Sequence, residues 1–181
     1  MTHRAWTAVL TACLGTLPLA ARPAPADSGH PAPAAPLSTV LRDRQGKNVG
    51  LVVVTETPHG LLLHVSLDGI PGGAHAIHIH ETGKCEPPFA TAGGHLNPGH
   101  KAHGILDPAG LHAGDLPNLV VPESGRLEVD VFADGLTLSP GPNSVLDADG
   151  SSVVIHARAD DYRTQPSGDS GDRIACAVLA R

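Results

Sequence analysis

Between residues 81 and 116 the chain loses all hydrophobic periodicity, and Gly, Pro and His dominate a stretch flanked on both sides by strand-like sequence. A segment of this length without secondary structure is uncommon inside a compact domain. Most of the twelve histidines of the chain lie in this stretch or just before it. Imidazole is a common metal ligand. We therefore expect metal ions and a disulfide to organise this segment in place of a hydrophobic core.

Short apolar runs rich in β-branched residues lie on both sides of the histidine-rich stretch. The first three are separated by the turn segments RQGKN and TPHG, which predicts an antiparallel meander. A second long loop is expected at residues 159–172, and no segment has the pattern of a strong amphipathic helix. The chain is therefore expected to be all-β, a sandwich or barrel. The predicted strands cover residues 37–43, 49–56, 61–67, 75–80, 118–122, 126–132, 152–157 and 174–179.

The first 26 residues have the features of a secretory signal peptide, with a short basic start, an apolar run and the small-residue string Ala24-Pro25-Ala26. The apolar run is too short for a membrane span. Leu10-Thr11-Ala12-Cys13 also resembles the lipobox of bacterial lipoproteins, so Cys13 is either a lipidation site or an incidental cysteine in a discarded segment. Residues 27–36 are expected to form a Pro/Ala-rich linker, and residues 37–181 the folded domain.

The charge balance limits the class of partner. The whole chain has 12 basic and 18 acidic residues, a net charge of −6. Removal of residues 1–26 takes away Arg4 and Arg22 but no acidic residue, which leaves 10 − 18 = −8. So acidic a domain is not expected to bind nucleic acid. Aromatic residues make up only 2% of the chain, so Val, Leu, Ile and Ala must build the interior.

Seven residues could together hold two metal ions. His78 and His80 are two residues apart on a predicted strand, so both point to the same face. Alone, such a pair is equally well explained as ordinary polar strand residues. Imidazoles suit copper and zinc, and three imidazoles with one carboxylate satisfy tetrahedral zinc. The further candidates lie in the long stretch or near the end of a later strand: His95, His103, His112, Asp115 and His156.

Together these segments resemble the copper/zinc superoxide dismutase family. The resemblance runs from about Leu37 to Arg181. The motif Asp-Asp-Tyr-Arg-Thr-Gln-Pro is similar to the corresponding segment of the bacterial periplasmic branch of the family. It implies an eight-stranded antiparallel Greek-key β-barrel or sandwich with two long loops, a metal loop and an electrostatic loop. The matching segments are Ala74–His80 followed by Cys85, Ala92–Pro98, His112–Asn118, Val154–His156 with Asp160–Tyr162, and Gly171–Cys176.

The resemblance implies a role for each matching residue. His95 would bridge the two ions, Asp160 would hydrogen-bond ligands of both, and Arg173 would attract the anionic substrate beside the copper. Cys85 and Cys176 would form the intrasubunit disulfide. The implied cofactors are one copper, cycling between Cu(II) and Cu(I), and one Zn(II) per subunit. The implied copper ligands are His78, His80, His95 and His156, and the implied zinc ligands are His95, His103, His112 and Asp115.

The implied activity is dismutation of superoxide to dioxygen and hydrogen peroxide, with Arg173 and His95 as catalytic residues. The enzyme would be periplasmic or secreted and would protect the cell envelope from extracytoplasmic superoxide. Membrane anchoring is expected only through a lipidated Cys13, and the chain could be a monomer or a homodimer. The alternative is a dismutase-like protein that binds or delivers copper without turnover. Such proteins typically lose a copper ligand or the arginine, and here all are present.

A few positions leave alternatives open. His100 lies near His103 and could compete for zinc, although the eight-residue step from His95 fits His103 better. His75 is expected to make a structural hydrogen bond. The residues that depart from the family pattern remove no ligand but could alter local packing; they are Ala76, Ile77, Lys84 and Ala177.

Overall fold

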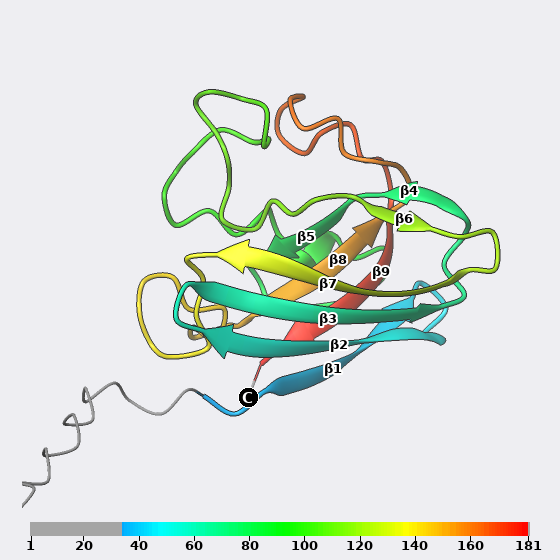
Figure 1. Ribbon diagram of the computed structural model, residues 1–181, viewed down its shortest axis with the longest axis horizontal. Coiled ribbons are helices and arrows are strands. Elements are labelled where there is room, and N and C mark those ends of the chain that lie inside the picture. Colours follow the sequence, from blue (N-terminus) through cyan, green and yellow to red (C-terminus); the bar gives the residue numbers. More distant parts are fainter. Residues whose placement is uncertain (1–33, 181) are drawn as a thin grey trace, which may run out of the picture. The chain divides into compact units, whose positions relative to one another are not determined.

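Antiparallel β-strands build the part of the chain that the computed structural model describes, residues 34–180 (Figure 1). The one helix in this part is a single 3₁₀ turn, Ala90–Ala92. The described residues therefore contain no helix that is long and apolar enough to cross a membrane. The predicted signal peptide, Cys13 and most of the linker lie outside the described residues. The strands are β1 (Leu37–Asp43), β2 (Asn48–Thr57), β3 (Gly60–Asp68), β4 (Gly73–His75), β5 (Ile77–His80), β6 (Leu119–Val121), β7 (Arg126–Asp134), β8 (Ser151–His156) and β9 (Arg173–Leu179).

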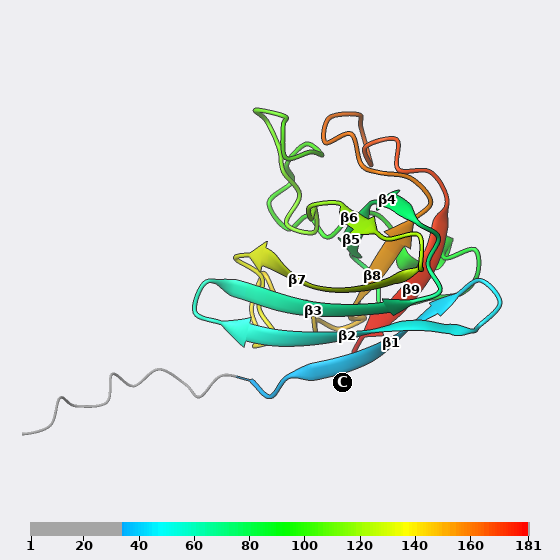
Figure 2. The same cartoon turned by 45° about the vertical axis from the view of Figure 1, so that its right-hand side comes forward.

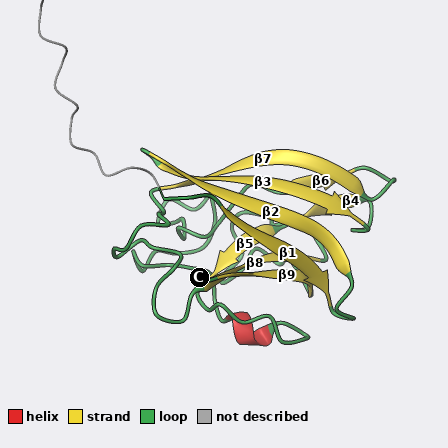
Figure 3. Cartoon of the chain, turned by 90° about the horizontal axis from the view of Figure 1, so that it is seen from below, coloured by secondary structure: helices red, strands yellow, loops and turns green. Residues whose placement is uncertain are grey.

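The larger sheet has seven strands in the order β5-β8-β9-β1-β2-β3-β7, and β4 pairs with β6 in a second, two-stranded sheet. The larger sheet curls, so that β7, β3 and β2 form one wall and β1, β9, β8 and β5 form the facing wall (Figures 2 and 3). The meander β1-β2-β3 is confirmed. The pairs β3–β7, β1–β9 and β5–β8 join strands distant in the chain, as Greek-key connections require. The predicted all-β antiparallel fold is therefore confirmed.

Aliphatic side chains fill the space between the two walls, as the scarcity of aromatic residues predicts. Along β3 the inward residues Leu61, Leu63 and Val65 have no exposed surface, whereas Leu62 and His64 face outward. The facing wall contributes buried residues such as Val153 and Ile155 to the same cluster. Burial of each such side chain is worth roughly 1.5–3 kcal/mol relative to exposure.

The predicted strand 75–80 is in fact two strands, so the described part has nine strands rather than eight. The chain changes partner at Ala76, because β4 pairs with β6 whereas β5 pairs with β8. Both backbone groups of Ala76 leave the ladder: its N–H donates to the carbonyl of Arg158, and its carbonyl accepts from the N–H of His156, each at 2.9 Å. The split carries the chain from one sheet to the other.

Irregular segments connect several of the strands, and two of them lie on the same side of the molecule (Figure 1). These two were predicted at residues 81–116 and 159–172. In the structure they are residues 81–118, here called the first loop, and residues 157–172, the second loop. Asn118 joins them, because its side chain donates to the carbonyl of Asp160 and accepts from the N–H of the same residue, at 2.9 and 2.8 Å. A third irregular segment, residues 135–150, is held to β2 by Glu56, which accepts hydrogen bonds from the backbone and hydroxyl of Ser139.

Candidate metal centre

The first loop forms backbone hydrogen bonds with the edge of β5 that does not pair with β8. Ile79 donates its N–H to the carbonyl of Gly114 and accepts at its own carbonyl from the N–H of Leu96, at 2.9 and 2.8 Å. A side chain at position 114 would collide with the carbonyl of Ile79, so only glycine permits this approach. The result is that His95 and Asp115 lie in bridge positions opposite His80 and His78. The core face of β5 carries Ile77 and Ile79, and its other face carries the two histidines.

Four histidines form a first cluster, with their nitrogen atoms within 4.8 Å of one another. They come from β5, the first loop and the end of β8, and all are buried. One ring nitrogen of each is buried and lacks a hydrogen-bond partner among the described residues. These atoms are Nδ1 of His78 and Nε2 of His80, His95 and His156.

The opposite nitrogen of each ring in the first cluster is occupied. His78 donates from Nε2 to Asp160 at 2.8 Å, and His80 donates from Nδ1 to the carbonyl of Gly93 at 3.0 Å. Nδ1 of His156 lies 3.0 Å from the hydroxyl of Ser170 and 3.3 Å from the carbonyl of Gly171. A neutral imidazole that donates from one nitrogen has its lone pair on the other. The lone pairs of these three rings therefore converge without a proton, the arrangement that a metal ion requires.

A second cluster surrounds one carboxylate oxygen. Oδ1 of Asp115 lies 2.7, 3.0 and 3.2 Å from Nδ1 of His95, His103 and His112. Nδ1 of His112 is also 3.3 Å from Nδ1 of His95. The edge of a tetrahedron with metal–ligand bonds of about 2.0 Å is about 3.3 Å, so these separations fit zinc. His95 belongs to both clusters, with Nδ1 in the second and Nε2 in the first.

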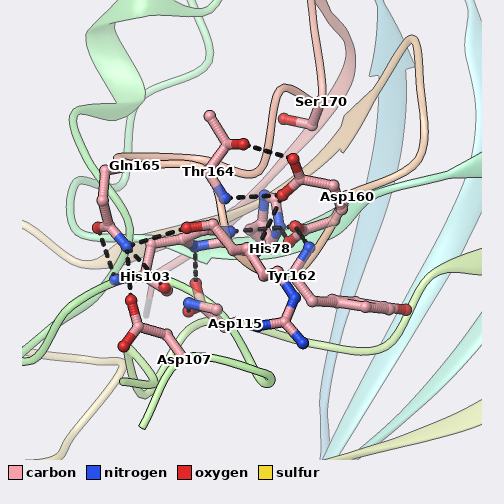
Figure 4. A network of polar contacts seen from close by, with 12 residues as sticks. His78, His103, Asp107, Asp115, Asp160, Tyr162, Thr164, Gln165 and Ser170 are labelled. Carbon is pink, nitrogen blue, oxygen red and sulfur yellow. Dashed lines mark hydrogen bonds and ion pairs between the residues drawn. The ribbon is translucent and has the colours of Figure 1, made fainter. Parts of the chain in front are cut away.

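Asp160, in the second loop, contacts one histidine ring of each cluster, His78 and His103 (Figure 4). Its Oδ2 accepts from Nε2 of His78, and its Oδ1 accepts from Nε2 of His103 at 3.0 Å and from the N–H of Tyr162 at 2.6 Å. The backbone of Gly168 packs so closely on this carboxylate that a side chain there would overlap it. Asp160 thus orients one ring of each cluster.

The electrostatics of the site favour bound cations. Burial lowers the pKa of His78 to about 4, that of His156 to about 3 and that of His80 well below its ordinary value. Burial alone would raise the pKa of Asp160, but hydrogen bonds from His78, Tyr162 and His103 outweigh it and lower the pKa to about 2. Burial would also raise the pKa of Asp115, but hydrogen bonds from His95 and from the N–H of Gly104 hold the pKa of this carboxyl below its usual range. The site therefore combines neutral imidazoles with two ionised carboxylates, and among the described residues both carboxylates contact histidine rings and neither forms an ion pair with a lysine or an arginine.

We expect the metal-free protein to lose stability as the pH falls from about 6.5 toward 4. Unfolded histidine titrates near pH 6.5, whereas folded His78 and His156 titrate at about 4 and 3. Between these pH values the unfolded state binds more protons than the folded state, so each step of acidification lowers the free energy of unfolding. Above pH 6.5 these histidines are neutral in both states, and their full contribution to stability is present. Denaturant unfolding of the metal-free protein at several pH values measures this slope.

The control for this experiment is His59→Ala, because His59 is an exposed histidine in the β2–β3 turn. This variant should keep the wild-type pH dependence. A free energy of unfolding that stays flat between pH 7 and pH 4.5 would contradict the expectation.

Arg173, the first residue of β9, lies at the entrance to the site. Its guanidinium donates to the carbonyls of Phe89 and Gly93, each at 2.7 Å. The Gly93 carbonyl also accepts from His80, so it links the arginine to the first cluster. A cleft of about 380 Å³ is lined by Arg173 together with His95 and His112. A small anion that entered it would meet both the guanidinium and the bridging ring.

The disulfide between Cys85 and Cys176 fastens the first loop to β9. It joins residues 91 positions apart, three positions after Arg173 on one side and four before Phe89 on the other. Beside it a small apolar cluster forms from Phe89, Ala92 and Val154. The disulfide therefore anchors the segment whose carbonyls hold Arg173.

His100 and His75 lie outside both clusters. His100 is exposed and lines the cleft. His75 makes the predicted structural contacts, with Nδ1 2.8 Å from the carbonyl of His156 and Nε2 3.0 Å from that of Pro71. Sequence reasoning did not identify Ser170 or Gln165, which contact His156 and His103. Serine and glutamine are common in loops, so their type alone gives no signal.

The chain is similar to known proteins over most of its length. A family model described as copper/zinc superoxide dismutase matches residues 48–179. The chain belongs to this family. A superoxide dismutase [Cu-Zn] of Caulobacter vibrioides is 42% identical over 146 residues, which cover 78% of this chain and 84% of the relative. The superoxide dismutase-like protein YojM of Bacillus subtilis is 46% identical over 143 residues, 77% of this chain and 73% of the relative.

Solved structures of the copper/zinc superoxide dismutase family share the fold. The crystal structure of a SOD-like protein from Bacillus subtilis superposes with a TM-score of 0.77 at 43% identity, covering 80% of this chain and 99% of that structure. The Cu/Zn superoxide dismutase from Brucella abortus gives a TM-score of 0.66 at 29% identity, covering 80% and 99%. Of the residues expected to depart from the family pattern, Ala76, Ile77 and Ala177 are buried, and Lys84 is exposed.

Proposed function

We propose that this chain is a superoxide dismutase that works outside the cytoplasm, with copper in the first cluster and zinc in the second. The observation that carries the proposal is a set of four buried ring nitrogens that have no hydrogen-bond partner among the described residues. They converge beside the second cluster, and His95 belongs to both clusters. Bound copper would supply the one-electron exchange with superoxide, and zinc, which has no redox chemistry, would hold its ligands in place.

Arg173 would attract and orient the substrate. Its guanidinium is half-buried and faces the cleft from a position fixed by two backbone carbonyls. The domain is acidic, so superoxide is repelled by the surface as a whole. A cation in a cleft with walls of low dielectric focuses the field locally, as is known for enzymes of this family.

His95 would donate a proton to the reduced substrate. Its Nδ1 lies against Asp115 and His112 in the second cluster, which leaves Nε2 as the atom facing the first cluster. Its ring also lines the cleft. We assign Nε2 of His95 as the atom that holds a proton and passes it to the reduced substrate. Asp160 keeps the neighbouring His78 ring fixed while this happens.

An extracytoplasmic location is supported by two observations. The Cys85–Cys176 bond needs an oxidising compartment to form and persist. Residues 1–26 have the pattern of a signal peptide. In the periplasm or outside the cell the enzyme would protect the envelope from superoxide produced there, as a monomer or homodimer, soluble or anchored through Cys13.

The deciding experiment measures copper and zinc content and superoxide turnover of the purified mature protein. One copper, one zinc and turnover support the proposal. Two bound metals without turnover would favour the second candidate, a copper-binding or copper-delivery protein. That candidate remains relevant because one relative, at 46% identity, is named superoxide dismutase-like.

Arg173→Ile is expected to lower kcat/KM for superoxide at low ionic strength by about tenfold or more, because the local field at the cleft is lost. Metal content should stay at the wild-type level, since Arg173 belongs to neither cluster. Arg173→Lys should retain part of the rate, because it keeps the charge but loses the paired hydrogen bonds to Phe89 and Gly93. Pulse radiolysis at two salt concentrations measures the effect, and an unchanged rate at low salt would remove Arg173 from the mechanism.

A further inference from the structure

Gln165, in the second loop, forms two hydrogen bonds with the backbone of His103 in the first loop. Its side-chain Oε1 accepts from the N–H of His103, and its Nε2 donates to the carbonyl of the same residue, both at 2.9 Å (Figure 4). The same Nε2 lies 3.2 Å from the carboxylate of Asp107 and 3.2 Å from the carbonyl of Arg163. One planar amide thus satisfies both backbone groups of a single residue and joins the two loops.

His103 needs this support because it lies in no strand. It is fully buried, and within the described residues Gln165 is the hydrogen-bond partner of both its N–H and its carbonyl. Its ring is held at the other end, by Asp115 at Nδ1 and by Asp160 at Nε2. Rotation of the backbone would therefore carry Nδ1 away from the second cluster.

We propose that Gln165 is a positioning residue for the second cluster, which fixes His103 and thereby sets how tightly zinc is retained. This inference rests on the proposed function, since it takes the second cluster as the zinc site. Glutamine suits the role because its amide offers a donor and an acceptor side by side. Glutamate has the same shape but no donor, and it would place a second carboxylate beside Asp107 and the His103 carbonyl.

The test compares Gln165→Ala and Gln165→Glu with Gln45→Ala, a matched control in the exposed β1–β2 turn. Zinc affinity is measured by competition with a chelator, and copper affinity is measured in the same proteins. Loss of a partner that orients a metal ligand typically weakens metal binding by about 10–100-fold. We expect this loss for zinc in both Gln165 variants, with little change for copper and none in the control.

Cobalt(II) in the zinc site supplies a readout that a general loss of stability would not move. Its visible absorption reports the ligand geometry, and we expect the bands to shift in both Gln165 variants but not in Gln45→Ala. Wild-type zinc affinity in the Gln165 variants, or an equal loss for copper and zinc, would overturn the inference while leaving the proposed function intact. A wild-type protein that binds no zinc would overturn both.

Discussion

Replacing Cys85 and Cys176 together by alanine should lower the free energy of unfolding of the metal-free protein by about 4–5 kcal/mol. The bond closes a loop between residues 91 positions apart, and in the chain-entropy model a loop of this length greatly restricts the unfolded chain. Denaturant unfolding at neutral pH under oxidising conditions measures the difference. A loss of this size is a large part of the stability of an ordinary domain.

The wild-type protein treated with a reductant is the matched control for this variant. It should fall to the stability of the double variant, and the double variant should not respond to the reductant. Equal stability of the oxidised wild type and the variant would contradict the prediction. We also expect turnover to fall more than metal content, because the bond anchors the segment whose Phe89 and Gly93 carbonyls hold Arg173.

Most of the strands could be predicted from the sequence because their signals are local. The β-branched run 37–43 coincides with β1, and the apolar run 61–67 lies within β3. The division of the strand at Ala76 could not be predicted. It depends on which strands lie beside β4 and β5, and an alanine at that position fits a continuous strand equally well.

The candidate ligands were found for a different reason. Imidazoles at a spacing of two on a strand and in a stretch without periodicity are rare enough to indicate metal chemistry. The structure brings all seven candidates together in two clusters. The groups that hold them are less distinctive: the amide of Gln165, the hydroxyl of Ser170 and the carbonyl of Gly93 have no sequence signal. Their roles arise only when segments that are distant in the sequence meet in the fold.

Asp160→Ala should weaken the binding of both copper and zinc, each by about 10–100-fold. Asp160 accepts hydrogen bonds from Nε2 of His78 in one cluster and Nε2 of His103 in the other. Without these acceptors, each ring can turn or move its proton to Nδ1, the nitrogen that faces a metal. Competition titrations with chelators measure both affinities. The control is Asp161→Asn, because Asp161 is exposed and its carboxylate accepts hydrogen bonds from the backbone N–H groups of Arg163 and Thr164 in its own loop.

Asp160→Asn separates orientation from the mere presence of a polar group. An asparagine offers one oxygen and one NH₂ group, so it can accept from one ring but presents a donor to the other. The ring that faces the NH₂ group is driven to carry its proton on Nδ1, where it blocks the lone pair. The asparagine variant should therefore lose affinity mainly for one of the two metals, whereas the alanine variant loses affinity for both. Wild-type affinity for both metals in Asp160→Ala would show that the clusters hold their geometry without this carboxylate.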